Sequence, residues 1–386
     1  MHKISIDSQK NNSEDLLLLS VHLSPNENII KKLKEILRHN IDWGLFLTLA
    51  SKSGMAKTVY TNLSNISRRI PVPGYVLEKL KFRYISIIQK TESQYRETLA
   101  ILKVFSAKGI PVVPLKGPLL SKRLYGGDIT ARGASVDLDL LVKEKNAEDA
   151  RRILEFTGYR CASWEEDGGT KKLWGQTNFH KTGNSTIDLH WKIGASVLGG
   201  DTTDAFWEGI RSADENSTEY YELNEEELLL HLSVHFVSSA RLRHLRYVCD
   251  IHQLLSKYVN TMDWTKITDK AIRLNLSGSL YATLMFTKAL FDSDVPKGAL
   301  VKLRPNLPTV LLVKLLANKK TVLRSDSRER HFIDTFLKHI IFQLFEARSF
   351  KDYVAILFPP KEIIGDKSYL RLFIGGITKF IKAIIR

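Results

Sequence analysis

The chain has 386 residues, of which 44% are hydrophobic and 26% charged, so it is long enough for two or three domains with an ample core. This composition is that of a folded globular protein and excludes an intrinsically disordered one. The formal net charge of +15 favours anionic partners, such as nucleotides, nucleic acids, acidic peptides or membrane surfaces, without choosing among them.

The sequence predicts a cytoplasmic protein with no integral membrane association. Apolar runs such as Leu16–Leu19 are far too short to span a bilayer, and the residues after Met1 lack the hydrophobic region of a signal peptide. Cys161 and Cys249 are isolated and have no CxxC spacing, which fits a reducing compartment.

Residues 1–108 are predicted to form an N-terminal helical region. Ser13 is expected to cap a short Leu-rich turn, and apolar residues then repeat at helical spacing over residues 26–38. The Pro-Val-Pro-Gly cluster at 71–74 breaks this pattern. A long helical pattern follows over residues 76–107 and is expected to end at Gly109.

Residues 109–195 change character and are predicted to form a separate core. A short strand over residues 110–115 is followed by a turn of Lys116, Gly117 and Pro118 into a helix. Gly117 would let the backbone approach a ligand closely, the first N–H groups of the helix favour a phosphate, and Lys116 would add positive charge. Taken alone, a Lys-Gly turn is weak evidence for a phosphate site, and a plain strand-to-helix turn is its usual explanation.

The acidic stretch 135–142 is predicted to be a strand. Strict alternation places Asp137 and Asp139 on one face, and Leu138 and Leu140 on the other. Two like charges beside each other on an apolar strand are unfavourable unless cations neutralise them. An isolated Asp-x-Asp pair more often lies on a solvated edge strand, so the rest of the chain has to decide between the two interpretations.

A second strand, over residues 186–193, is predicted to present a third carboxylate. Alternation places Asp188 on the polar face, together with His190 and Lys192. Three carboxylates from two neighbouring strands could hold two divalent ions, and Asp188 could also act as a base toward an attacking hydroxyl. The alternative for Asp188 is the polar face of a surface strand.

Residues 196–386 are predicted to form a C-terminal helical domain with a basic tail. His231 and His235 have a spacing that can bind zinc, but no catalytic glutamate lies between them, so hydrogen-bonded core histidines are the preferred interpretation. Arg246 and Asp250 are expected to form an ion pair one helical turn apart. Arginines of this segment could instead contact a triphosphate.

The last quarter of the chain is strongly basic. Residues 291–386 contain 18 Lys and Arg against 9 Asp and Glu, and residues 369–386 are amphipathic. This last segment is predicted to be a helix that closes the C-terminal bundle, with a helix on a membrane surface as the alternative.

Several separated motifs occur together in an order that resembles one family. They are Leu-Lys-Gly at 115–117, Leu-Tyr at 124–125, Arg132, the acidic strand at 137–142, Asp-Leu-His-Trp at 188–191, Phe-Trp-Glu at 206–208, His-Leu-Ser-Val-His at 231–235, residues 245–250 and Asp-Trp at 263–264. With Trp43, they closely resemble the uncharacterised nucleotidyltransferase family of the DNA polymerase β-like superfamily. The likeness covers roughly residues 42–296.

This resemblance implies an α+β fold, in which a small mixed β-sheet with flanking helices lies between N-terminal and C-terminal helical regions. It implies two Mg²⁺ ions, with Mn²⁺ as an alternative, on Asp137, Asp139 and Asp188. The donor would be an NTP, most simply ATP. A nucleoside monophosphate would pass to an acceptor, and pyrophosphate would be released.

The residues expected to bind the nucleotide are Lys116, Gly117, Arg132, Ser135, His190, Arg246 and Asp250. Gly117 matches the phosphate-binding glycine of the superfamily, and Lys116 matches the lysine that this family places beside it. One departure concerns Pro118, which has neither a hydroxyl nor an N–H group, whereas the superfamily usually has serine or glycine there. We therefore expect phosphate binding to depend more on Lys116, Arg132 and later helix amides.

The acceptor stays open on the sequence alone: a small molecule, a tRNA, a protein or a ribosomally made peptide would each suit this reaction. A non-enzymatic alternative is a basic nucleic-acid-binding or scaffolding protein that retains the fold. A third hypothesis is a zinc hydrolase that uses His231 and His235.

Overall fold

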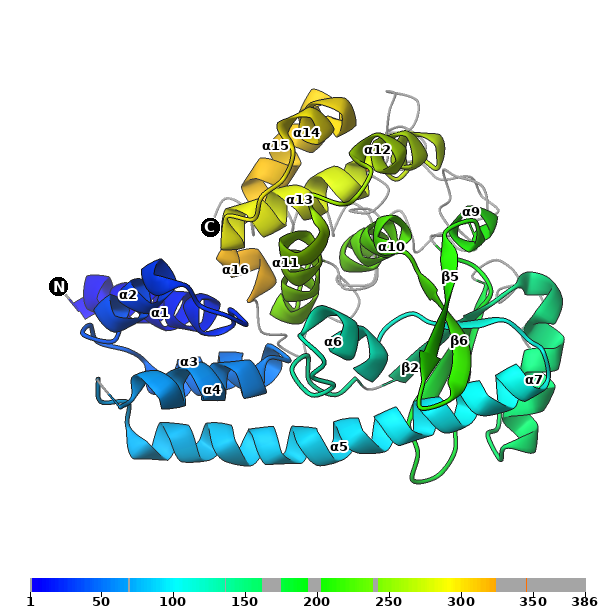
Figure 1. The fold of residues 1–386 in the computed structure, drawn as a ribbon. Coiled ribbons are helices and arrows are strands. Elements are labelled where there is room, and N and C mark those ends of the chain that lie inside the picture. The colour runs from blue at the N-terminus through cyan, green and yellow to red at the C-terminus, as the bar shows by residue number, and fades with distance from the viewer. Residues whose placement is uncertain are drawn as a thin grey trace, which may run out of the picture.

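A computed structural model of the chain describes residues 2–68, 70–135, 137–161, 175–193, 203–238, 242–323 and residue 345. The chain begins with a group of helices, α1 (His2–Ser20), α2 (Glu27–Ile36), α3 (Trp43–Lys52) and α4 (Ala56–Ile66). Of these, α3 and α4 pack beside the first half of the long helix α5 (Gly74–Ala107), which runs beneath the molecule in Figure 1, and α1 packs on α3 and α4. The N-terminal region is therefore helical, as predicted.

Helix α5 connects this N-terminal group to the sheet. It has 34 residues, which gives a length of about 50 Å. Its first half contacts α3 and α4, and its second half contacts the sheet and α7 (Ala147–Phe156). Gly109 follows the helix with a positive φ of 64°, so the predicted helix end is confirmed.

The prediction for Ser13 is wrong. Ser13 does not begin a short turn but lies inside α1, where its hydroxyl donates a hydrogen bond to the carbonyl of Gln9 at 2.9 Å. The same hydroxyl accepts a hydrogen bond from the Asp42 N–H group. Tertiary packing of the leucines that follow, of which Leu16 and Leu17 are fully buried, extends the helix beyond what the local pattern indicated.

The predicted small mixed sheet is present. It contains β1 (Val112–Pro114), β2 (Asp137–Val142), β3 (Gln176–Phe179) and β4 (Thr186–His190), in the order β1-β2-β4-β3. Strands β2 and β4 are parallel, and each pairs with an antiparallel edge strand, β1 or β3. The chain returns from β3 to β4 through a turn that contains Gly183, which has a positive φ of 79°.

The two faces of the sheet pack against different parts of the chain. Leu138, Leu140, Ile187 and Leu189 are buried in one cluster with apolar residues of α5 and α7. The opposite face, which carries the acidic side chains, is turned toward the C-terminal helices, because Leu141 belongs to their cluster. The helix α6 (Pro118–Leu124) connects β1 to the segment before β2.

One element was not predicted. Residues 196–386 were expected to be helical throughout, but β5 (Ile210–Glu215) and β6 (Thr218–Leu223) form an antiparallel hairpin. Its two turn residues, Asn216 and Ser217, both have positive φ, which is the geometry of the tight turns that favour hairpins. Asn216 and the residues Thr218, Tyr220 and Tyr221, whose types favour strands, were the sequence signals for this hairpin.

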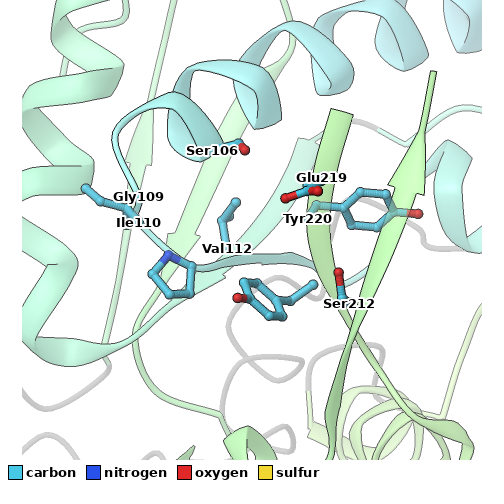
Figure 2. Close-up of a pocket in the computed structure, with 9 residues that line it drawn as sticks. Ser106, Gly109, Ile110, Val112, Ser212, Glu219 and Tyr220 are labelled. Atoms are coloured by element: carbon cyan, nitrogen blue, oxygen red, sulfur yellow. The ribbon is translucent and has the colours of Figure 1, made fainter. Parts of the chain in front are cut away.

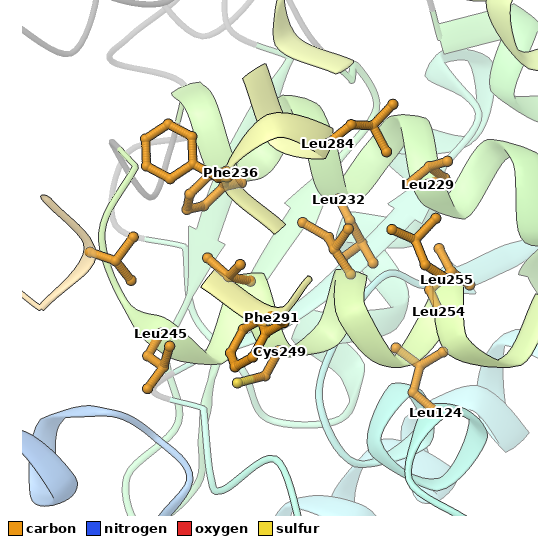
Figure 3. Close-up of a cluster of buried hydrophobic side chains, with 14 of the residues drawn as sticks. Leu124, Leu229, Leu232, Phe236, Leu245, Cys249, Leu254, Leu255, Leu284 and Phe291 are labelled. Carbon is orange, nitrogen blue, oxygen red and sulfur yellow. The ribbon is translucent and has the colours of Figure 1, made fainter. Parts of the chain in front are cut away.

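The remaining described helices form a C-terminal bundle. They are α9 (Thr203–Trp207), α10 (Glu225–Ser238), α11 (Leu245–Tyr258), α12 (Trp264–Arg273), α13 (Ser277–Phe291), α14 (Lys297–Leu303), α15 (Leu307–Leu316) and α16 (Lys319–Val322). Figure 3 shows leucine and phenylalanine side chains of α10, α11 and α13 meeting in the bundle core. The same cluster includes Phe46 and Val59 of the N-terminal helices, so the first and last regions share one core.

Two predictions concern the chain beyond this bundle. The amphipathic helix predicted for residues 369–386 lies outside the described residues. Among the helices that the structure describes, none combines the length and the apolar character that crossing a bilayer requires.

Candidate active site

Strand pairing brings the predicted carboxylates together. Asp139 of β2 is directly opposite Asp188 of the parallel neighbour β4. Side chains at paired positions of neighbouring strands point to the same face, and Asp137 shares that face because it lies two residues before Asp139. The expectation that two strands present the three acidic residues to one place is therefore met.

Asp188 lies in a strongly anionic environment. Burial and the neighbouring carboxylates of Asp137 and Asp139 raise the pKa of Asp188 to about 7, and a hydrogen bond joins its carboxyl group to that of Asp137. Its Oδ1 atom is buried and has no hydrogen-bond partner. A bound cation would reduce the repulsion among the three carboxylates and would give the Oδ1 atom of Asp188 a partner.

Asp139 is the best-compensated carboxylate of the three. Its side chain is 5% exposed, and its Oδ1 atom accepts hydrogen bonds from Lys116 Nζ at 2.8 Å and from His190 Nε2 at 3.2 Å. Burial opposes ionisation, but Lys116 and His190 outweigh it and hold the pKa of Asp139 well below its usual value. Asp139 is thus an anion in the folded protein.

The residues present fit a divalent cation. Asp139, Asp188 and His190 each offer a ligand atom, and these atoms all lie within 4.8 Å of one another. Carboxylate oxygens are the ligands that Mg²⁺ and Mn²⁺ prefer, and the imidazole extends the range to other transition metals. His190, which was expected to contact the nucleotide, is the third member of this group, while Asp137 lies beside Asp188.

The turn after β1 places Lys116 beside Asp139. The Leu115 N–H group donates a hydrogen bond to the Asp139 carbonyl at 3.0 Å, so the β1–β2 ladder continues to this point. Gly117 follows with φ 83° and ψ −154°, a backbone conformation that is essentially restricted to glycine. Pro118 is the first residue of α6, as predicted, and this helix has only seven residues.

Lys116 has a second partner that sequence reasoning missed. Its ammonium group donates a hydrogen bond to Nε2 of His235 at 2.7 Å, and the Lys116 side chain is only 8% exposed. His235 projects from α10, which is remote from the sheet in sequence. The sequence signal for this contact was the presence of two histidines among the apolar residues that follow the first turn of α10.

Among the described residues, neither His231 nor His235 belongs to a group of three side chains that could hold a zinc ion. Their ring centroids are 6.3 Å apart, and Nε2 of His235 is already bonded to Lys116. Burial and the nearby ammonium group of Lys116 lower the pKa of His231 to about 3 and hold the pKa of His235 well below its usual value. Both histidines are therefore neutral core residues. His235 is hydrogen-bonded, as the preferred interpretation had it, but neither ring nitrogen of the buried His231 has a hydrogen-bond partner, so that interpretation is wrong for His231.

Arg132 and Asp250 form a buried ion pair instead of facing a cleft. Arg132 Nε donates to Asp250 Oδ2 at 2.7 Å, and the two side chains are 1% and 0% exposed. Asp250 Oδ1 accepts a further hydrogen bond from the Tyr125 hydroxyl at 2.9 Å. Arg132 also donates to the Ser135 hydroxyl at 3.4 Å. These residues, expected to bind nucleotide, connect the segment before β2 to α11.

The pairing predicted between Arg246 and Asp250 is wrong, because Asp250 is bonded to Arg132. Arg246 donates instead to the carbonyl of Ala134 at 3.2 Å and to the Tyr247 hydroxyl at 3.3 Å. Its N–H group on the main chain donates to the carbonyl of Ser53. Arg246 therefore joins α11, the segment before β2 and the N-terminal helices.

That same segment packs tightly on the N-terminal helices. A Cβ atom at Gly133, which has φ 75°, would lie 2.5 Å from the carbonyl oxygen of Gly54. Ser135, which follows, exchanges two main-chain hydrogen bonds with the Gln94 side chain of α5. The start of the acidic strand is thus held from two sides.

A cavity elsewhere in the molecule is unsuited to an NTP. Figure 2 shows it between the end of α5, the start of β1 and the β5–β6 hairpin, and its volume is ≈ 200 Å³. Ligand pockets usually have about 300–1,000 Å³. None of Asp137, Asp139 and Asp188 lines this cavity.

Comparison with known proteins decides the family. Residues 39–292, about two thirds of the chain, match the family described as "Uncharacterised nucleotidyltransferase". The chain belongs to this family. The matched region of this nucleotidyltransferase contains every predicted site residue. Its bounds agree with the range of roughly residues 42–296 over which the motifs resemble the family. No curated protein and no solved structure gives a significant match to the chain.

Proposed function

We propose that the chain is a Mg²⁺-dependent enzyme that transfers a nucleoside monophosphate from an NTP, with ATP as the most abundant donor, to an acceptor hydroxyl or similar group. One observation carries the proposal. In a chain of a nucleotidyltransferase family, Asp139 and Asp188 are paired in register and form, with His190, a group that fits a divalent cation.

The reaction is a displacement at the α-phosphorus atom. The acceptor oxygen forms a bond to this phosphorus, the bond from the phosphorus to the bridging oxygen of the β-phosphate breaks, and pyrophosphate leaves. The proton of the acceptor hydroxyl needs a base, and we assign this role to Asp188. A divalent ion on the carboxylate group would stabilise negative charge on the phosphate oxygens.

The chain's own residues would mainly position the reactants. Phosphoryl transfer requires little covalent chemistry from the protein, so in-line alignment and charge compensation account for most of the catalysis. The turn at Gly117 has a glycine-specific backbone next to the carboxylates and would let the donor's phosphates approach. Asp137 would complete the carboxylate triad through its contact with Asp188.

The buried arginine receives a different role from the one expected. Arg132 has its counter-charge in Asp250, and neither side chain reaches the surface. We therefore assign Arg132, Ser135 and Asp250 to supporting the acidic strand. The acceptor stays open among a small molecule, a peptide, a protein and a tRNA.

The experiment is transfer of label from α-³²P NTPs, supplied one at a time with Mg²⁺ and a host extract. The wild-type protein should label one acceptor class and release pyrophosphate. Asp139→Asn should abolish both, because it removes the negative charge that opposes the cation. Asp149→Asn on the exposed side of α7 is the matched control and should behave like wild type.

Circular dichroism of each variant separates loss of chemistry from loss of fold. If a folded Asp139→Asn protein transfers label at the wild-type rate, the site assignment fails. Salt-sensitive RNA binding by the wild-type protein with no pyrophosphate release would support the non-catalytic alternative instead.

A further inference from the structure

The ammonium group of Lys116 lies beside the carboxylate of Asp139, at a position where a bound metal cation would be expected. Nζ is 2.8 Å from Oδ1 of Asp139, and the same oxygen accepts a hydrogen bond from His190 Nε2 at 3.2 Å. Asp139 and His190 are two of the three residues that could hold a divalent ion. Lys116 and a metal ion would therefore compete for the same ligand atoms.

His235 fixes the ammonium group in this position. Nε2 of His235 is 2.7 Å from Nζ of Lys116, and the histidine ring packs against Tyr247 with a centroid distance of 4.7 Å. The other ring nitrogen of His235 is buried without a partner, so the ring makes its one polar contact with Lys116. Because these two rings belong to the packed helices α10 and α11, the position of the His235 nitrogen that accepts from Lys116 is fixed by the protein core.

Withdrawal of Lys116 from the site would be unfavourable. It would leave the buried carboxylate of Asp139 without its ammonium partner and His235 without its only hydrogen bond. An exposed lysine has no such restraint, but the Lys116 side chain is 8% exposed. The residue is thus built into the site.

We propose that Lys116, positioned by His235, takes one of the two cation positions of the site, so that each chain binds a single divalent ion. This inference rests on the proposed function for the location of the metal site and replaces the expectation of two ions. Like charges close together repel, so the divalent ion would bind on the Asp188 side, where Oδ1 has no partner. His235 is then a positioning residue that acts through Lys116.

The test is a Mn²⁺ titration of the nucleotide-free protein, with free Mn²⁺ measured by electron paramagnetic resonance. Wild-type protein should bind one Mn²⁺ per chain. Lys116→Met should bind a second Mn²⁺ at least tenfold more tightly than wild type does, because the competing charge is gone. Lys122→Met is the matched control, because it removes the same charge from a lysine that pairs with Glu215 outside the site. This variant should bind one Mn²⁺ ion, like wild type.

Two further variants test the role of His235. His235→Leu removes the acceptor and should also create a second Mn²⁺ site, whereas His235→Gln retains an acceptor and should bind one ion. Lys116→Gln replaces Lys116→Met if the latter fails to fold by circular dichroism.

Several results would overturn the inference. These are two Mn²⁺ ions of similar affinity on wild type, none at all, or an unchanged titration in folded Lys116 variants. The inference and the proposed function fail separately. A wild-type enzyme that transfers label but binds two Mn²⁺ refutes only the inference. The expected Mn²⁺ pattern without transfer of any label refutes only the function.

Discussion

Substitution of Asp250 by asparagine should destabilise the protein strongly without touching the proposed chemistry. Asp250 is fully buried, and its two oxygens accept hydrogen bonds from Arg132 at 2.7 Å and from Tyr125 at 2.9 Å. Asparagine has nearly the same shape and retains an oxygen for Tyr125. What the substitution removes is the negative charge opposite the Arg132 guanidinium group, which is 1% exposed.

The magnitude follows from this burial. A guanidinium group inside the protein cannot recover its hydration when its partner is neutralised, so breaking a buried pair from one side costs about 3–5 kcal/mol. Because the Tyr125 contact persists, we expect the lower end, about 3 kcal/mol of unfolding free energy. The surface pair of Lys302 and Asp269, with side chains 39% and 61% exposed, is the matched control.

The assay is urea unfolding of wild type, Asp250→Asn and Asp269→Asn, followed by tryptophan fluorescence and circular dichroism. The control should lose at most about 1 kcal/mol, since exposed pairs are hydrated in both states. A loss below about 1 kcal/mol for Asp250→Asn would refute the structural role of the pair. It would return Arg132 to the candidates for nucleotide binding.

Three further outcomes are expected. Gly117→Ala, at φ 83° and ψ −154°, should cost about 1–3 kcal/mol in urea unfolding, whereas Gly298→Ala in α14, with open space around it, should be neutral or stabilising. Burial lowers the pKa of His252 to about 4, below the unfolded value of about 6.5. Its stabilising contribution is therefore complete above pH 6.5 and lost as the pH falls toward 4. His252 alone should account for about 2 kcal/mol of the fall in unfolding free energy between pH 7 and pH 5, so this fall should be about 2 kcal/mol smaller in His252→Gln than in wild type. Asp137→Ala should abolish pyrophosphate release and leave the circular dichroism spectrum unchanged. If this variant instead releases pyrophosphate at the wild-type rate, Asp137 is not part of the site.

The sheet and its acidic face were predictable from sequence because strand alternation is a local signal. Asp137 and Asp139 stand two residues apart, and Asp188 occupies the polar face of a second alternating segment. The apolar residues between them identify the buried face without any tertiary information. Helix α5 was predictable for the same reason, since its periodic pattern ends at Gly109.

Contacts between distant segments were not predictable in this way. Helical spacing suggested Arg246 as the partner of Asp250, yet Arg132, which is 118 residues away, has the better geometry in the folded chain. The bond between Lys116 and His235 spans 119 residues and depends on how α10 packs over the sheet. The hairpin of β5 and β6 was missed because its charged residues resemble those of a solvated helix.

The central claim is that Asp139, Asp188 and His190 bind a divalent cation, and anomalous diffraction from a crystal soaked in Mn²⁺ tests it most directly. We predict an anomalous peak within direct coordination distance of Asp188 and at least one of the other two side chains, and no such peak in Asp188→Asn crystals soaked alongside. Wild-type crystals with no peak there, or with Mn²⁺ bound only at other carboxylates, would contradict the claim.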